Sequence, residues 1–166
     1  MGARAPAADL NAANLAALLR TFPALGVICQ TSDGTWAYNC HAFGAGITDA
    51  WWDPVDPARP GPHMPPWVRI DWPQGLPRND WSLANFMGAF ETMGYERCQG
   101  EDAETRVEKI ALYASSGAVT HTARQESGGN WISKLGSNID LHHRAPGALE
   151  SASYGSVVAL MQRPIA

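Results

Sequence analysis

The chain has 166 residues, a formal net charge of −4 and an isoelectric point near 5.7. This length predicts a single domain, spanning residues 1–166, that can bury roughly 70% of the surface of its unfolded chain without help from disulfides or metal. The acidic balance and the scattered Lys and Arg residues exclude an electrostatic surface for nucleic acid. No segment reaches the ~18 apolar residues of a membrane-spanning helix, so neither nucleic acid nor a membrane is expected as a partner.

The N-terminal segment 1–8 is rich in Ala and Pro, and we expect it to fray. The apolar stretch that follows is interrupted by Asn11, Asn14 and Arg20, which is atypical of a secretory signal peptide. A cytoplasmic protein is therefore expected, or one exported without a signal peptide. The cysteine content agrees, because an odd number at irregular spacing favours free thiols in a reducing compartment. These cysteines are Cys29, Cys40 and Cys98.

The first third predicts a short helix, a strand and a turn before a second helix. Asp9 or Asn11 can cap a helix that runs through Arg20. Residues 27–30 are typical of a strand, and residues 31–34 of a tight turn. Asn39 stands at an N-cap position, so a helix is expected from Cys40 to about Ala50.

Residues 51–80 have a different character, because they contain four of the seven Trp and most of the twelve Pro. So many prolines disfavour regular structure, and so many tryptophans disfavour full exposure to water. We expect an ordered loop, called here the Trp/Pro segment, that packs over the domain. Long loops in compact domains are often lids or binding loops.

The second half predicts one helix followed by strands. A helix beginning at Asp80 or Ser82 and closed by Gly94 places its apolar residues on one face. Alternation and β-forming residues predict the strands that follow. The fold class is therefore α+β, with an antiparallel meander in the C-terminal half packed against N-terminal helices. The expected strands are residues 95–98, 107–114, 119–125, 131–135 and 154–163.

Cys40 and His121 form the best candidate pair for chemistry. A thiol at the start of a helix lies near the positive end of the helix dipole, which lowers its pKa. A histidine on a strand is held rigidly and can accept the thiol proton, giving a thiolate–imidazolium pair. The alternative is structural, with Cys40 as a small buried hydrophobe and His121 as a hydrogen-bonded, half-buried histidine. No spacing of Cys and His predicts a metal site, and no cofactor is expected.

The segment Tyr38-Asn39-Cys40-His41-Ala42-Phe43 resembles the nucleophile helix of papain-like cysteine hydrolases, including the NlpC-type peptidases and amidases. The stretch KIALYASSGAVTHTARQESGGNWISKLG is similar to their sheet, with the histidine at the head of a later strand. The chain also resembles an uncharacterised bacterial family with a YNC-x-A segment, a Trp/Pro loop and a late SKLG stretch. The papain-like resemblance implies a papain-like fold for the single domain.

The resemblance also implies a third residue that orients the histidine. Papain has an Asn soon after the Lys of its third strand, whereas Leu135 follows Lys134 here. Asp140 is the favoured replacement, with Asn138 next, and His142 or His143 after these. Papain's oxyanion glutamine would correspond to Gln30, although the Cys40 backbone N–H is the safer donor.

The expected function is a cysteine-dependent hydrolase of the peptidase or amidase type, acting on a peptide or amide-containing substrate that could be a protein. Cys40 would attack, His121 would transfer the proton, and Asp140 or Asn138 would orient His121. The Trp/Pro segment would form one wall of the cleft. The alternative is a papain-like module without catalysis, used in binding or immunity through the Trp/Pro segment. A toxin or effector that competes between bacteria would share the hydrolase chemistry.

Overall fold

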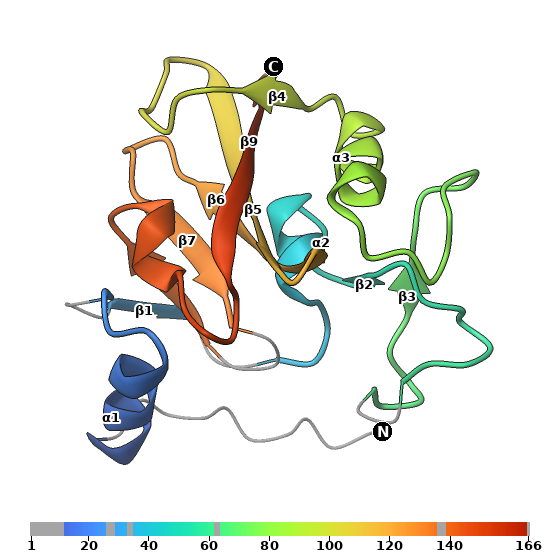
Figure 1. Ribbon diagram of the computed structural model, residues 1–166, viewed down its shortest axis with the longest axis horizontal. Helices are drawn as coiled ribbons and strands as arrows, with labels where there is room; N and C mark the ends of the chain where they lie inside the picture. The colour runs from blue at the N-terminus through green and yellow to red at the C-terminus, as the bar shows by residue number, and fades with distance from the viewer. Residues whose placement is uncertain (1–11, 26–28, 33–34, 62–63, 136–138, 166) are drawn as a thin grey trace.

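The structure is a computed structural model that describes residues 12–25, 29–32, 35–61, 64–135 and 139–165, with only the backbone described at 12–15 and 29–32. Three α-helices precede most of the strands (Figure 1). They are α1 (Ala12–Thr21), α2 (Cys40–Gly44) and α3 (Leu83–Glu91). None of the helices in this part of the chain is long and apolar enough to cross a bilayer.

Seven strands form one sheet in the order β1-β8-β7-β6-β5-β9-β4, with every neighbouring pair antiparallel. The predicted α+β class is therefore confirmed. A separate pair of two-residue strands lies in the Trp/Pro segment, β2 (Trp51–Trp52) and β3 (Ile70–Asp71). The sheet strands are β1 (Cys29–Ser32), β4 (Glu96–Cys98), β5 (Val107–Ser115), β6 (Ala118–Gln125), β7 (Trp131–Lys134), β8 (Asp140–His143) and β9 (Ser156–Pro164).

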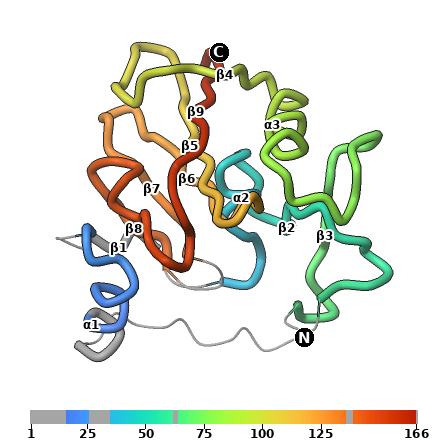
Figure 2. Tube along the Cα trace, viewed as in Figure 1, coloured from blue at the N-terminus to red at the C-terminus, as the bar shows by residue number. Residues whose placement is uncertain are grey.

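The meander was predicted correctly for three strands and incorrectly for the fourth. β5, β6 and β7 follow one another as expected, but the next strand in the sheet is β8, which the sequence analysis did not predict. The strand predicted at 154–163 crosses instead to the other side of β5, where β9 pairs along its length. A short 3-10 helix, η1 (Pro146–Leu149), lies between β8 and β9 in the chain. Figure 2 follows this crossing of the chain in front of the sheet.

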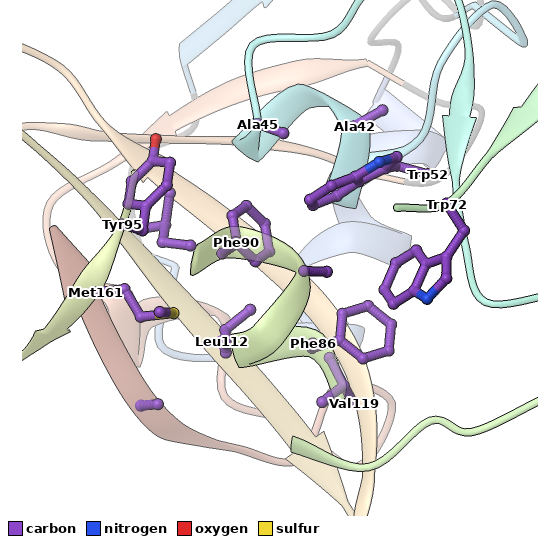
Figure 3. Close-up of a cluster of buried hydrophobic side chains, with 13 residues drawn as sticks. Ala42, Ala45, Trp52, Trp72, Phe86, Phe90, Tyr95, Leu112, Val119 and Met161 are labelled. Atoms are coloured by element: carbon purple, nitrogen blue, oxygen red, sulfur yellow. The ribbon is translucent and has the colours of Figure 1, made fainter. Parts of the chain in front are cut away.

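Hydrophobic clusters lie on the two faces of the sheet. The first cluster joins α2 and α3 to residues such as Leu112 of β5. Figure 3 shows Phe86 and Phe90 of α3 within it, beside Trp52 and Trp72 of the Trp/Pro segment. The second cluster contains Phe22, just after α1, and the fully buried Leu149 of η1. The expected packing against N-terminal helices is thus divided between two faces, α1 on one and α2 with α3 on the other.

Three predicted boundaries changed. The helix expected from Cys40 to about Ala50 ends at Gly44, after little more than one turn. Residues 31 and 32 of the predicted turn belong to β1. α3 ends at Glu91, and Gly94 takes the left-handed conformation with φ of +87° just beyond it. Residues 27–28 and 33–34 of the predicted strand and turn lie outside the described residues, as does the segment 1–8.

Candidate active site

Asn39 fixes the start of α2 and therefore the position of Cys40. Its side-chain oxygen accepts the backbone N–H of Ala42 at 3.0 Å, which confirms the predicted N-cap. The same oxygen accepts the N–H of Trp52 at 3.1 Å, and the amide nitrogen donates to Asp53 at 2.8 Å. One side chain thus ties the helix start to β2 of the Trp/Pro segment.

The Cys40 thiol is buried, with 7% of the residue exposed. Burial raises its pKa to about 12, against the opposing effect of backbone hydrogen bonds from Thr122, His41 and Cys40 itself. The negative charge of Asp53 raises it further. The predicted lowering of the thiol pKa by the helix start is therefore wrong for the resting protein, because desolvation outweighs the donors of a one-turn helix.

His121 lies on β6 with no exposed surface. Its ring stacks on Tyr154, with centroids 4.2 Å apart and planes 5° from parallel, and meets Tyr113 edge-on at 5.2 Å. Burial lowers its pKa well below the usual value, and the nearby His41 and His143 act in the same direction. The resting pair is therefore a neutral thiol and a neutral imidazole, not the predicted ion pair.

The side chains of His121 and Cys40 are joined through the backbone and not by a direct hydrogen bond. The backbone N–H of Thr122, the residue after His121, lowers the pKa of the Cys40 thiol and therefore lies near the sulfur. The Thr122 hydroxyl lies 2.7 Å from Nδ1 of His41 in α2. Successive side chains of a strand point to opposite faces, so the His121 ring leaves β6 on the side away from α2. Nδ1 of His121 has no hydrogen-bond partner among the described residues.

Near Thr122, β6 does not pair with the neighbouring strand β7. The two strands pair only at Arg124 with Ile132 and at Gln125 with Trp131. Around Thr122, β6 has therefore separated from β7, and the start of α2 contacts both strands. The thiol thus lies near the backbone N–H of Thr122, the residue after His121. Among the residues that the structure describes, Nδ1 of His121, the ring nitrogen nearest the backbone, has no hydrogen-bond partner.

A chain of hydrogen bonds holds the other side of the His121 ring. Nε2 of His121 lies 3.0 Å from the Ser133 hydroxyl on β7. The same hydroxyl lies 2.8 Å from Nε2 of His143 on β8, and Nδ1 of His143 lies 2.8 Å from the carbonyl of Ala145. All three side chains are buried. Sequence reasoning missed Ser133, although it stands two positions before the Leu135 that was compared with papain.

Asp140 occupies a different place from the one predicted for an orienting residue. It accepts the Tyr38 hydroxyl at 3.0 Å and is the register partner of the buried Lys134 across β7 and β8. His121 makes its hydrogen bond to Ser133 instead. Because Lys134 and Ser133 are adjacent on β7, their side chains leave opposite faces of the sheet, so Asp140 lies on the face that carries Lys134. Asn138 and the side chain of Gln30 lie outside the described residues.

The other histidines that the structure describes are buried or half-buried. His41 is buried against Phe86, and burial lowers its pKa to about 3. His142, a further candidate for orienting His121, lies half-buried instead, 3.4 Å from Glu126. His143 belongs to the Ser133 chain. In the described part of the chain, no three His, Cys, Asp or Glu side chains gather as a metal site would require.

Asp53 is a second group that sequence reasoning missed. It is 5% exposed, hydrogen-bonded by Asn39 and close enough to affect the Cys40 thiol. Burial raises its pKa to about 7, although the Asn39 amide opposes this shift. The only sequence signal was its place at the start of the Trp/Pro segment, directly after Trp51-Trp52.

In the described residues of the Trp/Pro segment, much of the aromatic surface is packed. Trp52 and Trp72 are buried in the first hydrophobic cluster, and Trp51 stacks on Trp36 at 6.0 Å. Trp67 is 59% exposed. The packing part of the expectation is confirmed, while a substrate-facing role of the segment remains a prediction.

The described residues thus define an α+β protein with a buried thiol at a helix start and a buried histidine on the neighbouring strand. A family model matches residues 29–162, so the chain belongs to the family described as a domain of unknown function (DUF7689). The matched range includes Cys40, His121, Ser133 and His143. No curated protein and no solved structure matches the chain.

Proposed function

We propose that this protein is a cysteine-dependent hydrolase of the peptidase or amidase type, with a papain-like arrangement of helix and sheet. The observation that carries the proposal is the state of His121. One ring nitrogen is held by Ser133, and the other is buried with no hydrogen-bond partner in the described part of the chain. The next residue along β6, Thr122, has its backbone N–H near the Cys40 thiol. A histidine anchored on one side and open on the other is what a proton-transfer partner requires.

The reaction starts from a neutral thiol. As the Cys40 sulfur attacks the carbonyl carbon of an amide, its proton passes to Nδ1 of His121, so no buried ion pair exists before substrate arrives. This step requires the His121 ring, which lies on the face of β6 away from α2 in the resting protein, to reach the thiol where β6 and β7 do not pair. The imidazolium then gives this proton to the leaving amine, and a thioester remains on Cys40. Water attacks the thioester with His121 as the base, which releases the acid and restores the thiol.

The oxyanion of the tetrahedral intermediate needs hydrogen-bond donors. The backbone N–H groups of Thr122, His41 and Cys40 each lower the pKa of the Cys40 thiol, so all three lie near the sulfur. Donors so close to the attacking atom are placed to stabilise negative charge that develops next to it. Gln30 was predicted for this role by resemblance, and its part remains a prediction.

The test uses the full chain and peptidyl vinyl sulfones, whose activated alkene forms a thioether with a catalytic thiol, together with peptidyl coumarin amides as substrates. We expect an adduct at Cys40 and hydrolysis that falls by about a hundredfold or more in Cys40→Ser and His121→Gln. Cys98→Ser is the matched control, because Cys98 is a thiol at the sheet edge far along the chain. It should retain full activity.

The alternative is a papain-like module without catalysis. The burial of both Cys40 and His121 favours it, since each group is held in its neutral form and the thiol is 7% exposed. The exposed Trp67 of the Trp/Pro segment would then belong to the binding surface. An absence of hydrolysis, with Cys40 modified no faster than Cys98 at any pH from 6 to 9, would replace the hydrolase by this alternative.

A further inference from the structure

The hydrogen bonds that join His121, Ser133 and His143 all have a definite donor and acceptor. These roles follow from the last acceptor in the series, the carbonyl of Ala145. The carbonyl of Ala145 can only accept, so Nδ1 of His143, 2.8 Å away, carries the proton. Burial lowers the pKa of His143 to about 4, which keeps the ring neutral near pH 7. Nε2 of a neutral ring protonated at Nδ1 is an acceptor.

The remaining protons are then determined. The Ser133 hydroxyl, 2.8 Å from Nε2 of His143, must donate to it. Its oxygen is therefore free to accept from Nε2 of His121 at 3.0 Å, which places the His121 proton on Nε2. The other nitrogen of His121, Nδ1, is left as an unprotonated lone pair, and it is the ring nitrogen for which the described residues offer no hydrogen-bond partner.

We propose that Ser133 and His143 are positioning residues that fix His121 in the tautomer with its basic nitrogen at Nδ1. The inference rests on the proposed function for its catalytic meaning, because only a base at Nδ1 can take the Cys40 proton. A single carboxylate or amide is the simpler way to orient a histidine. Here a hydroxyl between two imidazoles does so, and it places no charge in a site that is buried on all sides.

The stacking of Tyr154 and the edge contact of Tyr113 limit rotation of the His121 ring but cannot choose between its tautomers. The hydrogen bond between Nε2 of His121 and the Ser133 hydroxyl decides the tautomer. Removal of the Ser133 hydroxyl therefore leaves the ring in place while its proton is free to move to Nδ1. The wrong tautomer of an otherwise well-placed catalytic histidine costs about 10⁴-fold in the serine proteases.

The experiment reads the tautomer directly. Long-range ¹H–¹⁵N correlation spectra of the uniformly ¹⁵N-labelled full chain at pH 7 distinguish a protonated from an unprotonated ring nitrogen. We expect Nε2–H for His121 and Nδ1–H for His143 in the unmodified protein. In Ser133→Ala and His143→Leu, the His121 signals should move toward Nδ1–H. In His143→Gln, whose amide oxygen can replace the Nε2 acceptor, they should stay as in the parent protein.

The outcomes separate the two proposals. A proton on Nδ1 of His121 in the parent protein overturns the positioning role, as does an unchanged tautomer in a folded Ser133→Ala protein. The tautomer of His121 in the parent protein is measured without any variant, so this test does not depend on whether a variant folds. The expected tautomer in a protein without hydrolase activity or Cys40 adduct retains the positioning role and rejects the hydrolase. Where hydrolysis is present, Ser133→Ala should lower it about tenfold or more, and His143→Gln should restore most of what His143→Leu loses.

Discussion

Burial decides the protonation of the groups around Cys40, and Asp53 is the most informative of them. Its pKa of about 7 lies well above that of an ordinary aspartate, near 3.9. Its carboxyl group is close to the thiol that we propose as the nucleophile, and its charge raises the thiol pKa. Ionisation of Asp53 should therefore make Cys40 less acidic as the pH rises through 7.

Asp53→Asn is expected to stabilise the protein at pH 8. Between about pH 4 and pH 7 the folded chain keeps the Asp53 proton and the unfolded chain has released it, so stability falls as pH rises through this window. The asparagine removes this loss, on the order of 4 kcal/mol above pH 7, while its amide oxygen can still accept from Asn39. Urea unfolding at pH 5 and pH 8 measures the difference.

Asp102→Asn is the matched control, because Asp102 is exposed in the loop before β5. It should change the free energy of unfolding by less than about 0.5 kcal/mol at both pH values. An Asp53→Asn protein with the same pH dependence as the parent would show that Asp53 is not protonated in the folded state near neutral pH.

At the scale of elements, the close approach of α2 to β6 positions the thiol. Gly44 permits it, since a Cβ atom at this position would lie 2.5 Å from Cγ2 of Thr122. The contact joins the end of α2 to Thr122, whose backbone N–H lies near the Cys40 thiol. A glycine in a short helix is unfavourable in itself, so tertiary packing provides the stabilisation of α2.

Gly44→Ala is expected to lower the free energy of unfolding by about 1–3 kcal/mol, because the added methyl forces the helix away from β6. Thr122→Ser removes the opposing methyl and keeps the hydroxyl that contacts His41. The double variant should regain most of the loss, which a double-mutant cycle of denaturant unfolding measures.

Gly88→Ala in α3 is the control for helix propensity, since its Cβ would meet Leu76 only at ordinary contact distance, 3.5 Å. We expect no loss there, and a gain of up to about 1 kcal/mol. Additive effects of Gly44→Ala and Thr122→Ser would contradict the close contact between α2 and β6.

At the scale of the whole molecule, three neutral buried histidines make the fold sensitive to acid. Burial lowers the pKa values of His41 and His143 to about 3 and about 4, and that of His121 well below its usual value. Below about pH 6.5 the unfolded chain takes up protons at these positions and the folded chain does not. Each histidine then weakens folding by about 1.4 kcal/mol per pH unit.

We therefore expect the free energy of unfolding to fall steeply from pH 6.5 to about pH 4.5. The unfolded chain takes up about three more histidine protons than the folded chain, and the proton that the folded chain keeps on Asp53 offsets about one of them. Denaturant unfolding at a series of pH values gives the slope. His121→Gln should reduce it by about one proton. His142→Gln, at a half-buried surface position beside Glu126, is the control and should leave most of the slope in place. A flat profile between pH 6.5 and pH 4.5 would contradict the neutral burial of these histidines.

Local patterns of sequence were sufficient for several features of this protein. Asn39 predicted the helix start at Cys40, and Asp80 or Ser82 predicted that of α3, where the structure uses Ser82, because an N-cap depends on residues within one turn. Alternation predicted β5, β6 and β7, because the side-chain period of a strand is local. The polar sequence Asp140-Leu-His-His concealed β8, whose place is determined by pairing with β1 and β7.

The sequence by itself thus determined the α+β class, the helix start at Cys40 and the strand that carries His121. Only the tertiary structure decided that Ser133 holds His121 and that Asp140 meets Tyr38. It also decided the neutral state of the pair. The physical reason is that these properties depend on desolvation and on contacts between strands far apart in the chain, and a local pattern encodes neither.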